Sequence, residues 1–426
     1  MEIRVVKIGV AIVFLETILF LFAGIAIGVV AGICPGLHVN TTIPLILAFS
    51  AMLGLGPYQS IVMIVAIGMT EMFVDYIPSV FIGAPDVDTA LSILPCHRLL
   101  HEGNGYEAVK LAVVGGVGAL LFSLVLIVFV AQWFQTLYEI SRPYIQYIII
   151  AVVGYMVLSE RRPRKIAAAA LIILLTGMLG IIVLNSSLVP QDEALFPVLT
   201  GMFGLSGLAV SLGESSCIPL QNEKSELKIS KREMVKSIVL ASIAGVVVGF
   251  LPAVGISEAA IMVQSLGGGG SARSFIMTTS GINTANDLFS LVSLWLVGNP
   301  RSGSSVAVQQ VIGDVTMFDV LFLIGSTLFT VGIAAVLTLK LAKMIPKFLQ
   351  KLNYKMLTLS IIGFVVFMIA IMTGPCGLLV AFTSASIGIL CMRLGVRRGH
   401  CMGVLLVSTI LFFTGLTPNV ISILGI

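Results

Sequence analysis

The sequence predicts an all-α polytopic membrane protein made of two inverted-topology repeats with broken or re-entrant helices. Three observations support this prediction: the composition, a series of apolar runs of membrane-spanning length, and helix-breaking motifs that recur at a constant spacing. Of the 426 residues, 58% are hydrophobic and only 10% are charged, whereas soluble chains carry about 25% charged residues. The net charge of +4 is too small to indicate a polyanionic partner. The composition therefore excludes an ordinary soluble protein, a disordered chain and a nucleic-acid binder.

Apolar runs long enough to cross a bilayer follow one another along the whole chain. A spanning helix needs about 20 apolar residues, because the hydrocarbon core is about 30 Å thick. Two shorter apolar pieces, residues 41–55 and 256–266, follow Pro/Gly motifs and are expected to be half-helices or hairpin arms. Together these runs predict roughly 12–14 membrane segments in a multi-pass protein of the cell membrane. The long runs begin near Ile8, Pro57, Ala108, Tyr144, Ile166, Leu195, Val235, Ser274, Met317, Met356, Cys376 and Cys401.

Two helix-breaking motifs recur in the same order in both halves of the chain. The segment around Pro35 matches the segment around Pro252 at an offset of 217 residues, which is 252 minus 35. The segment around Pro85 matches the segment around Pro300 at an offset of 215 residues, which is 300 minus 85. Such internal repeats are typical of secondary transporters. The chain is therefore divided into a first transmembrane repeat, a basic cytoplasmic linker and a second transmembrane repeat, at residues 1–213, 214–234 and 235–426.

Loops at matching positions of the two repeats exchange basic and uncharged character. Loop 160–165 carries four basic residues, whereas the matching loop 373–376 carries no charge. Loop 340–355 is strongly basic, whereas the matching loop 133–142 carries one basic residue. Because Lys and Arg concentrate in cytoplasmic loops, matching loops are expected on opposite faces of the membrane. The two halves should therefore superpose only after rotation about an axis in the membrane plane.

Ionisable and amide side chains form similar stripes on one helix of each repeat. Glu71 and Asp75 are four residues apart and so share a helix face, as do Asn283 and Asp287. Such groups are costly in the membrane and by default mark a transport pathway. For one residue alone, hydrogen bonding between helices is an equally good explanation, but two repeat-related stripes beside broken helices favour function. The predicted cation-coupling residues are Glu71, Asp75, Glu258, Asn283 and Asp287.

The helix-breaking motifs offer the complementary chemistry for an anion. A helix that begins inside the membrane presents free N–H groups and a partial positive charge, which hold a carboxylate without any lysine. The second repeat adds the guanidinium fork of Arg301. The alternative is that these motifs are only turns at the membrane surface. The predicted substrate-binding residues are Pro35, Gly36, Asn40, Thr41, Pro85, Asp86, Thr89, Gly255, Ser257, Pro300, Arg301 and Ser304.

Six ordered motifs give the chain a resemblance to a known family. They lie at residues 32–37, 83–85, 103–108, 197–205, 249–255 and 298–304. The chain resembles the large, multi-span permease subunit of tripartite tricarboxylate transporters, and it departs from that pattern at Pro252-Ala253 and Pro300-Arg301. The resemblance implies uptake of an organic anion driven by a cation gradient. It also implies a small membrane subunit and an extracytoplasmic binding protein as partners.

The sequence thus predicts a secondary active transporter that takes up an organic anion, such as a di- or tricarboxylate, coupled to Na⁺ or H⁺. No further cofactor, metal site or nucleic-acid partner is predicted. The alternatives are an intramembrane enzyme and a channel-like membrane protein. An enzyme would need a motif such as H-E-x-x-H or G-x-S-x-G, and Asp86-Val87-Asp88 is the nearest approach to one. The pairs Cys96-His97 and His101-Glu102 lack a third metal ligand, so residues 90–102 are predicted to form an amphipathic interfacial helix.

Overall fold

Helices make up all the regular structure in the part of the chain that the structure, a computed structural model, describes. The described residues are 2–34, 46, 50, 54–81, 93–190, 193–212, 221–222, 225–250, 256, 259–260, 263, 271–298, 302–349 and 354–425. The predicted all-α class is confirmed, because these residues contain no strand.

The helices begin close to the residues at which the apolar runs begin. In the first half they are α1 (Glu2–Ile33), α3 (Pro57–Val74), α4 (Tyr76–Phe81), α5 (Ile93–His101), α6 (Gly105–Ser141), η2 (Arg142–Tyr144), α7 (Ile145–Leu158), α8 (Pro163–Asn185), α9 (Leu195–Leu199), the π-helix η4 (Thr200–Leu205) and α10 (Ser206–Leu212). In the second half they are α11 (Lys231–Phe250), α13 (Ala272–Val297), α14 (Gly303–Ile312), α15 (Met317–Leu349), α16 (Tyr354–Leu394), η5 (Arg398–Met402), α17 (Gly403–Thr414) and α18 (Thr417–Leu424).

Six of the described helical segments are long and apolar enough to cross a membrane. A bent pair, Arg398–Thr414 with Thr417–Ile423, turns by 113° and would make a seventh span. The multi-pass membrane class is therefore confirmed, while the count of 12–14 segments stays a prediction. The two spans predicted to begin near Met356 and Cys376 form one element, α16, which is interrupted at Gly374 (φ 67°). The six segments are Leu15–Ile33, Pro57–Phe81, Gly105–Trp133, Pro163–Asn185, Met317–Lys347 and Thr358–Leu394.

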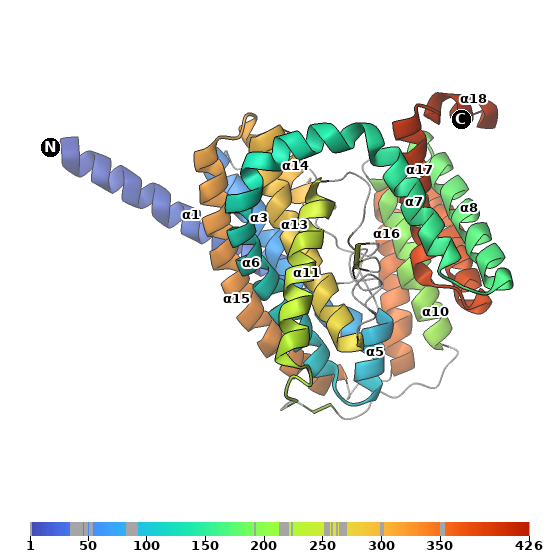
Figure 1. The fold of residues 1–426 in the computed structure, drawn as a ribbon. Coiled ribbons are helices and arrows are strands. Elements are labelled where there is room, and N and C mark those ends of the chain that lie inside the picture. The colour runs from blue at the N-terminus through green and yellow to red at the C-terminus, as the bar shows by residue number, and fades with distance from the viewer. Residues whose placement is uncertain are drawn as a thin grey trace.

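The main helix packings divide the described helices into two bodies, as Figure 1 shows. We call α1, α3–α6, α11 and α13–α15 the core body, and α7–α10 with α16–α18 the outer body. Each body takes helices from both halves of the chain, so the packing units are not the two halves of the sequence. In the core body α3 is central, because 94% of its span is buried inside the molecule. The short helix η2 connects α6 of the core body to α7 of the outer body.

Glycines allow the closest helix packings of the core body. α1 packs on α3, and α11 packs in the same way on α13. A methyl group at Gly28 would lie 2.7 Å from the carbonyl oxygen of Ile67, and one at Gly245 would lie 2.3 Å from Cβ of Ala285. Only a residue without a side chain permits backbones to approach this closely. Gly28 and Gly245 are equivalent residues of the predicted repeat, with the offset of 217 residues found around Pro35 and Pro252 (245 minus 28).

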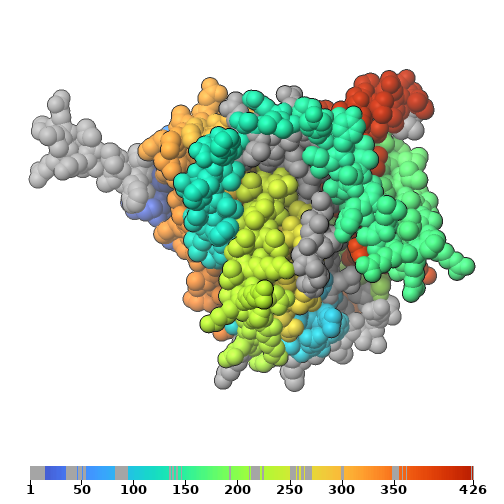
Figure 2. All heavy atoms as spheres, viewed as in Figure 1, coloured from blue at the N-terminus to red at the C-terminus, as the bar shows by residue number. Residues whose placement is uncertain are grey.

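Long helices of each half pack on helices of the other half. α6 of the first half packs on α13 of the second, and α15 of the second half packs on α3 of the first. In Figure 1, α5 and the beginning of α6 lie at one end of the core body, whereas α14 and the beginning of α15 lie at the opposite end. Figure 2, in the same view, shows α11 at the molecular surface beside α6.

Candidate functional site

The acidic stripe of the first half lies on α3, next to the end of α1. Glu71 and Asp75 are 3% and 8% exposed. Asp75 is the C-cap of α3, and its backbone N–H donates to the carbonyl oxygen of Glu71 at 2.8 Å. A methyl group at Gly32 of α1 would lie 2.9 Å from that same oxygen. The polar stripe is therefore pressed against α1 just before the predicted break at Pro35.

The stripe of the second half has the matching position on α13. Asn283 is buried and Asp287 is half-buried. A methyl group at Gly249 of α11 would lie 3.4 Å from the carbonyl oxygen of Asn286 and 2.9 Å from Cβ of Phe289. Each stripe thus lies beside the helix that leads into its own half's break. The structure places four of the five predicted cation-coupling residues on α3 and α13 in this way.

The beginning of α14 is the described part of the predicted anion site. Gly298 ends α13 in the left-handed conformation (φ 67°), and Ser302 caps α14. The N–H of Ser305 donates to Oγ of Ser302, and the N–H of Ser302 donates to Oγ of Ser305 at 2.9 Å. Oγ of Ser290 on α13 lies 2.8 Å from Oγ of Ser305. These bonds hold the start of α14 against α13, with Ser304 4% exposed in its first turn.

The other predicted site residues lie outside the described residues, and their roles stay predictions. They are Pro35, Gly36, Asn40, Thr41, Pro85, Asp86, Thr89, Gly255, Ser257, Glu258, Pro300 and Arg301.

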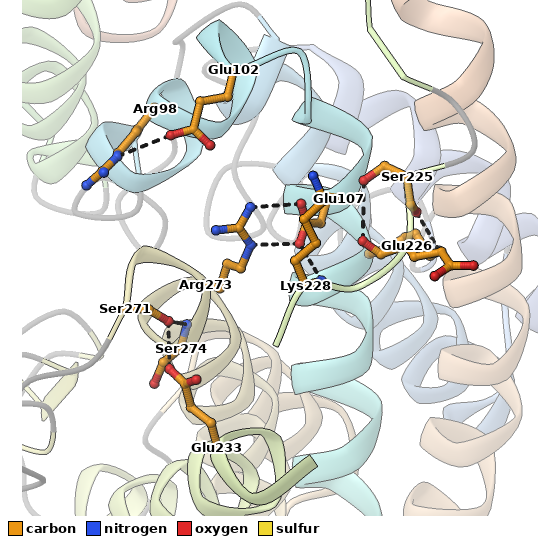
Figure 3. A network of polar contacts seen from close by, with 11 residues as sticks. Arg98, Glu102, Glu107, Ser225, Glu226, Lys228, Glu233, Ser271, Arg273 and Ser274 are labelled. Atoms are coloured by element: carbon orange, nitrogen blue, oxygen red, sulfur yellow. Dashed lines mark hydrogen bonds and ion pairs between the residues drawn. The ribbon is translucent and has the colours of Figure 1, made fainter. Parts of the chain in front are cut away.

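A buried ion pair that the sequence analysis missed joins the two halves (Figure 3). Glu107, at the start of α6, is fully buried. Arg273, at the start of α13, donates two hydrogen bonds to this carboxylate, from Nε to Oε1 at 2.7 Å and from Nη2 to Oε2 at 3.1 Å. The backbone N–H of Lys228 in the linker also donates to Oε1 at 2.8 Å. One carboxylate therefore holds together α6, α13 and the linker.

The opposite end of the core body has a related contact. Asp319, at the start of α15, is 3% exposed and accepts a hydrogen bond at 2.9 Å from the hydroxyl of Tyr58 at the start of α3. The N–H and hydroxyl of Thr316 donate to its other oxygen. Asp319 and Glu107 are both the third residue of their helices, and Tyr58 and Arg273 are both the second residue of theirs. The same arrangement thus occurs twice, once with a cation and once with a phenol.

The linker contacts the core body near the place where α5 ends and α6 begins. The N–H of Gly105 donates to Oε1 of Gln221 at 2.8 Å, and Nζ of Lys110 donates to the carbonyl oxygen of Ser225 at 3.1 Å. These bonds hold the linker, which connects α10 to α11, against the core body.

Polar side chains of the outer body meet at η5. Nε2 of His400 lies 3.0 Å from Oε1 of Glu160, and the N–H of Arg397 donates to that oxygen at 3.0 Å. Burial raises the pKa of Glu160, but the hydrogen bonds from Arg397 and His400 outweigh burial and leave this pKa below its ordinary value. Arg398, in the basic stretch 393–398 between α16 and α17, is only 8% exposed. The sequence gives no sign of this, because a buried and an exposed arginine look alike in a basic loop.

The described helices define a polytopic membrane protein. The chain belongs to the tripartite tricarboxylate transporter TctA family, whose sequence pattern matches residues 18–403. An uncharacterized protein of Methanocaldococcus jannaschii is 29% identical over 405 residues, which cover 93% of this chain and 98% of that protein. No solved structure matches the chain. The resemblance found from the sequence motifs is confirmed, and family membership points to transport and not to catalysis.

Proposed function

We propose that this chain is the permease of a secondary active transporter that takes up an organic anion across the cell membrane, coupled to Na⁺ or H⁺. The observation that carries the proposal is the pair of polar stripes, Glu71 with Asp75 and Asn283 with Asp287, which lie at matching places beside the ends of α1 and α11. Carboxylates within a membrane are costly and by default mark a transport pathway. Their oxygens suit a sodium ion or titrate with a proton.

The anion would bind at the breaks, where helices begin inside the membrane. The start of α14 supports this assignment, because Ser304 lies buried in its first turn, three residues after Arg301 in the sequence. N–H groups in a helix's first turn favour negative charge. Di- and tricarboxylates are the class of substrate that fits this site and the family. A small membrane subunit and an extracytoplasmic binding protein are the proposed partners.

We also propose that the two halves are inverted-topology repeats. The repeated contact of Glu107 with Arg273 and of Asp319 with Tyr58, at opposite ends of the core body, supports this proposal. Alternating access in such folds comes from one body moving against another around a fixed site. The core body and the outer body are the two units that would move.

Transport assays test the proposed function. Purified protein in proteoliposomes is offered a panel of labelled di- and tricarboxylates, with imposed Na⁺ or H⁺ gradients and with none. We expect gradient-dependent accumulation of at least one anion. Asp287→Asn should abolish accumulation but leave part of the exchange of internal for external anion, because the substrate site remains. Asp314→Asn, a carboxylate outside the two stripes, is the control. Failure of every anion to accumulate would refute the proposal.

A further inference from the structure

Arg398 of η5 is a buried cation that is anchored to the π-helix η4. Its Nη2 donates to the carbonyl oxygen of Phe203 at 2.8 Å and to Oγ of Ser206 at 2.8 Å, with the carbonyl oxygen of Met202 at 3.4 Å. Its guanidinium also lies over the ring of Phe203, 5.6 Å from the ring centre. π-Helices are rare and occur frequently at functional sites. The π-helix η4 thus presents backbone carbonyl oxygens to the guanidinium of Arg398.

Among the described residues, Arg398 has no carboxylate partner. Its Nε is buried and makes no hydrogen bond in that part of the chain. Glu160, the acid of the same corner, is occupied by His400 and by the backbone of Arg397. A buried charge without a countercharge is strongly unfavourable, and inside a membrane protein such a group indicates a functional site. Within the described part of the chain, the charge of Arg398 therefore lacks a counter-anion.

His97 lies on α5, which Figure 1 shows at the side of the core body that faces the outer body. Burial, then His101, then the charge of Arg398 lower the pKa of His97 to about 4. The charge of Arg398 thus contributes to the shift at His97 across the boundary between the two bodies. Nε2 of His97 is buried and has no hydrogen-bond partner among the described residues. Two buried nitrogen atoms that have no partner among the described residues, one from each body, are therefore candidates for one ligand.

We propose that Arg398 and His97 bind a carboxylate group of the transported anion between the core body and the outer body. This inference rests on the proposed function and adds a second contact to the helix starts, as a substrate with two or three carboxylates requires. Arg398 would donate from its buried Nε to the carboxylate, while Nη2 stays on η4. His97 would reach the same carboxylate from α5, so that the bound anion connects the two bodies.

The competing explanation is that Arg398 only joins η5 to η4. The contacts of Nη2 alone would satisfy that role, and a neutral donor would make them without placing a charge in the interior. The two explanations differ in one respect. A purely structural arginine does not affect anion affinity in a variant that folds, whereas a ligand does.

The test compares anion binding to the purified full-length chain and to matched variants. Citrate and succinate are titrated calorimetrically, with uncharged trimethyl citrate as a probe that lacks carboxylates. We expect Arg398→Gln to weaken binding by about tenfold or more, because a charged hydrogen-bond partner is lost, and His97→Ala to weaken it less. The controls are Arg397→Gln and His101→Ala, the exposed neighbours of the same residue types, which should leave the Kd unchanged.

A second measurement needs no variant. Hydrogen exchange of the wild-type chain, with and without citrate, should show slower exchange in peptides covering 195–206 and 395–403. No slowing there, or a wild-type Kd in folded Arg398→Gln, overturns the proposed carboxylate site while transport of the anion in proteoliposomes still supports the proposed function. If neither citrate nor succinate binds the wild-type chain, the proposed site is refuted as well. Failure of the whole panel to accumulate is the separate result that refutes the proposed function.

Discussion

Replacing Arg273 by glutamine should destabilise the core body strongly. The change removes both bonds from the guanidinium to the carboxylate of Glu107, which is fully buried. Among the described residues it leaves the 2.8 Å contact from the N–H of Lys228. Removing one partner of a buried ion pair costs about 3–5 kcal/mol, because the other charge stays uncompensated. We therefore expect the free energy of unfolding to fall by about that amount.

The double variant decides whether the pair itself is responsible. Glu107→Gln with Arg273→Gln removes both charges, so it should lose only about 0.5–1.5 kcal/mol, the range for neutral hydrogen bonds. The free energy of unfolding is measured by titration with sodium dodecyl sulfate in mixed micelles for the wild type, both single variants and the double variant. Arg98→Gln is the control, because Arg98 and Glu102 are 74% and 43% exposed and 3.4 Å apart, and such surface pairs contribute about 0–1 kcal/mol. Additive losses in the double variant would refute the reasoning.

Three further results are expected. Tyr58→Phe should lower the free energy of unfolding by about 1.5–3 kcal/mol, the range for one lost hydrogen bond to a charged group, because Asp319 keeps its bonds from Thr316. An unchanged value in the same titration would contradict this. Gly28→Ala should lower the yield of monodisperse purified protein, since the methyl group would lie 2.7 Å from a backbone oxygen. Gly154→Ala should be tolerated, because nothing lies within 4 Å of the added methyl group. Equal yields of the two variants would contradict the close packing. The free energy of unfolding should fall by up to about 3 kcal/mol from pH 6.5 to pH 4, because the pKa of histidine is near 6.5 in the unfolded chain and that of His97 is about 4 in the folded chain. His97→Gln should remove this part of the pH dependence, and a wild-type profile in that variant would contradict the prediction.

The sequence alone determined the class, the family and the starts of many helices. Pro57, Leu195 and Met317 are the first residues of α3, α9 and α15, as the apolar runs predict. Hydrophobic length is a local property, because each span must satisfy its own backbone groups in a fixed thickness of lipid. The equivalence of Gly28 and Gly245 was likewise visible in the order of the residues, and it proved to mark two matching helix packings.

Only the tertiary structure decided which polar groups meet. Glu107 and Arg273 are 166 positions apart, and nothing in either segment indicates the other. Arg398 is one of several basic residues between α16 and α17, and its burial depends on a π-helix almost 200 positions earlier in the chain. Contacts of this kind arise when helices of both halves pack crosswise into two bodies. Pairing then depends on the distances between packed helices, which local composition does not encode.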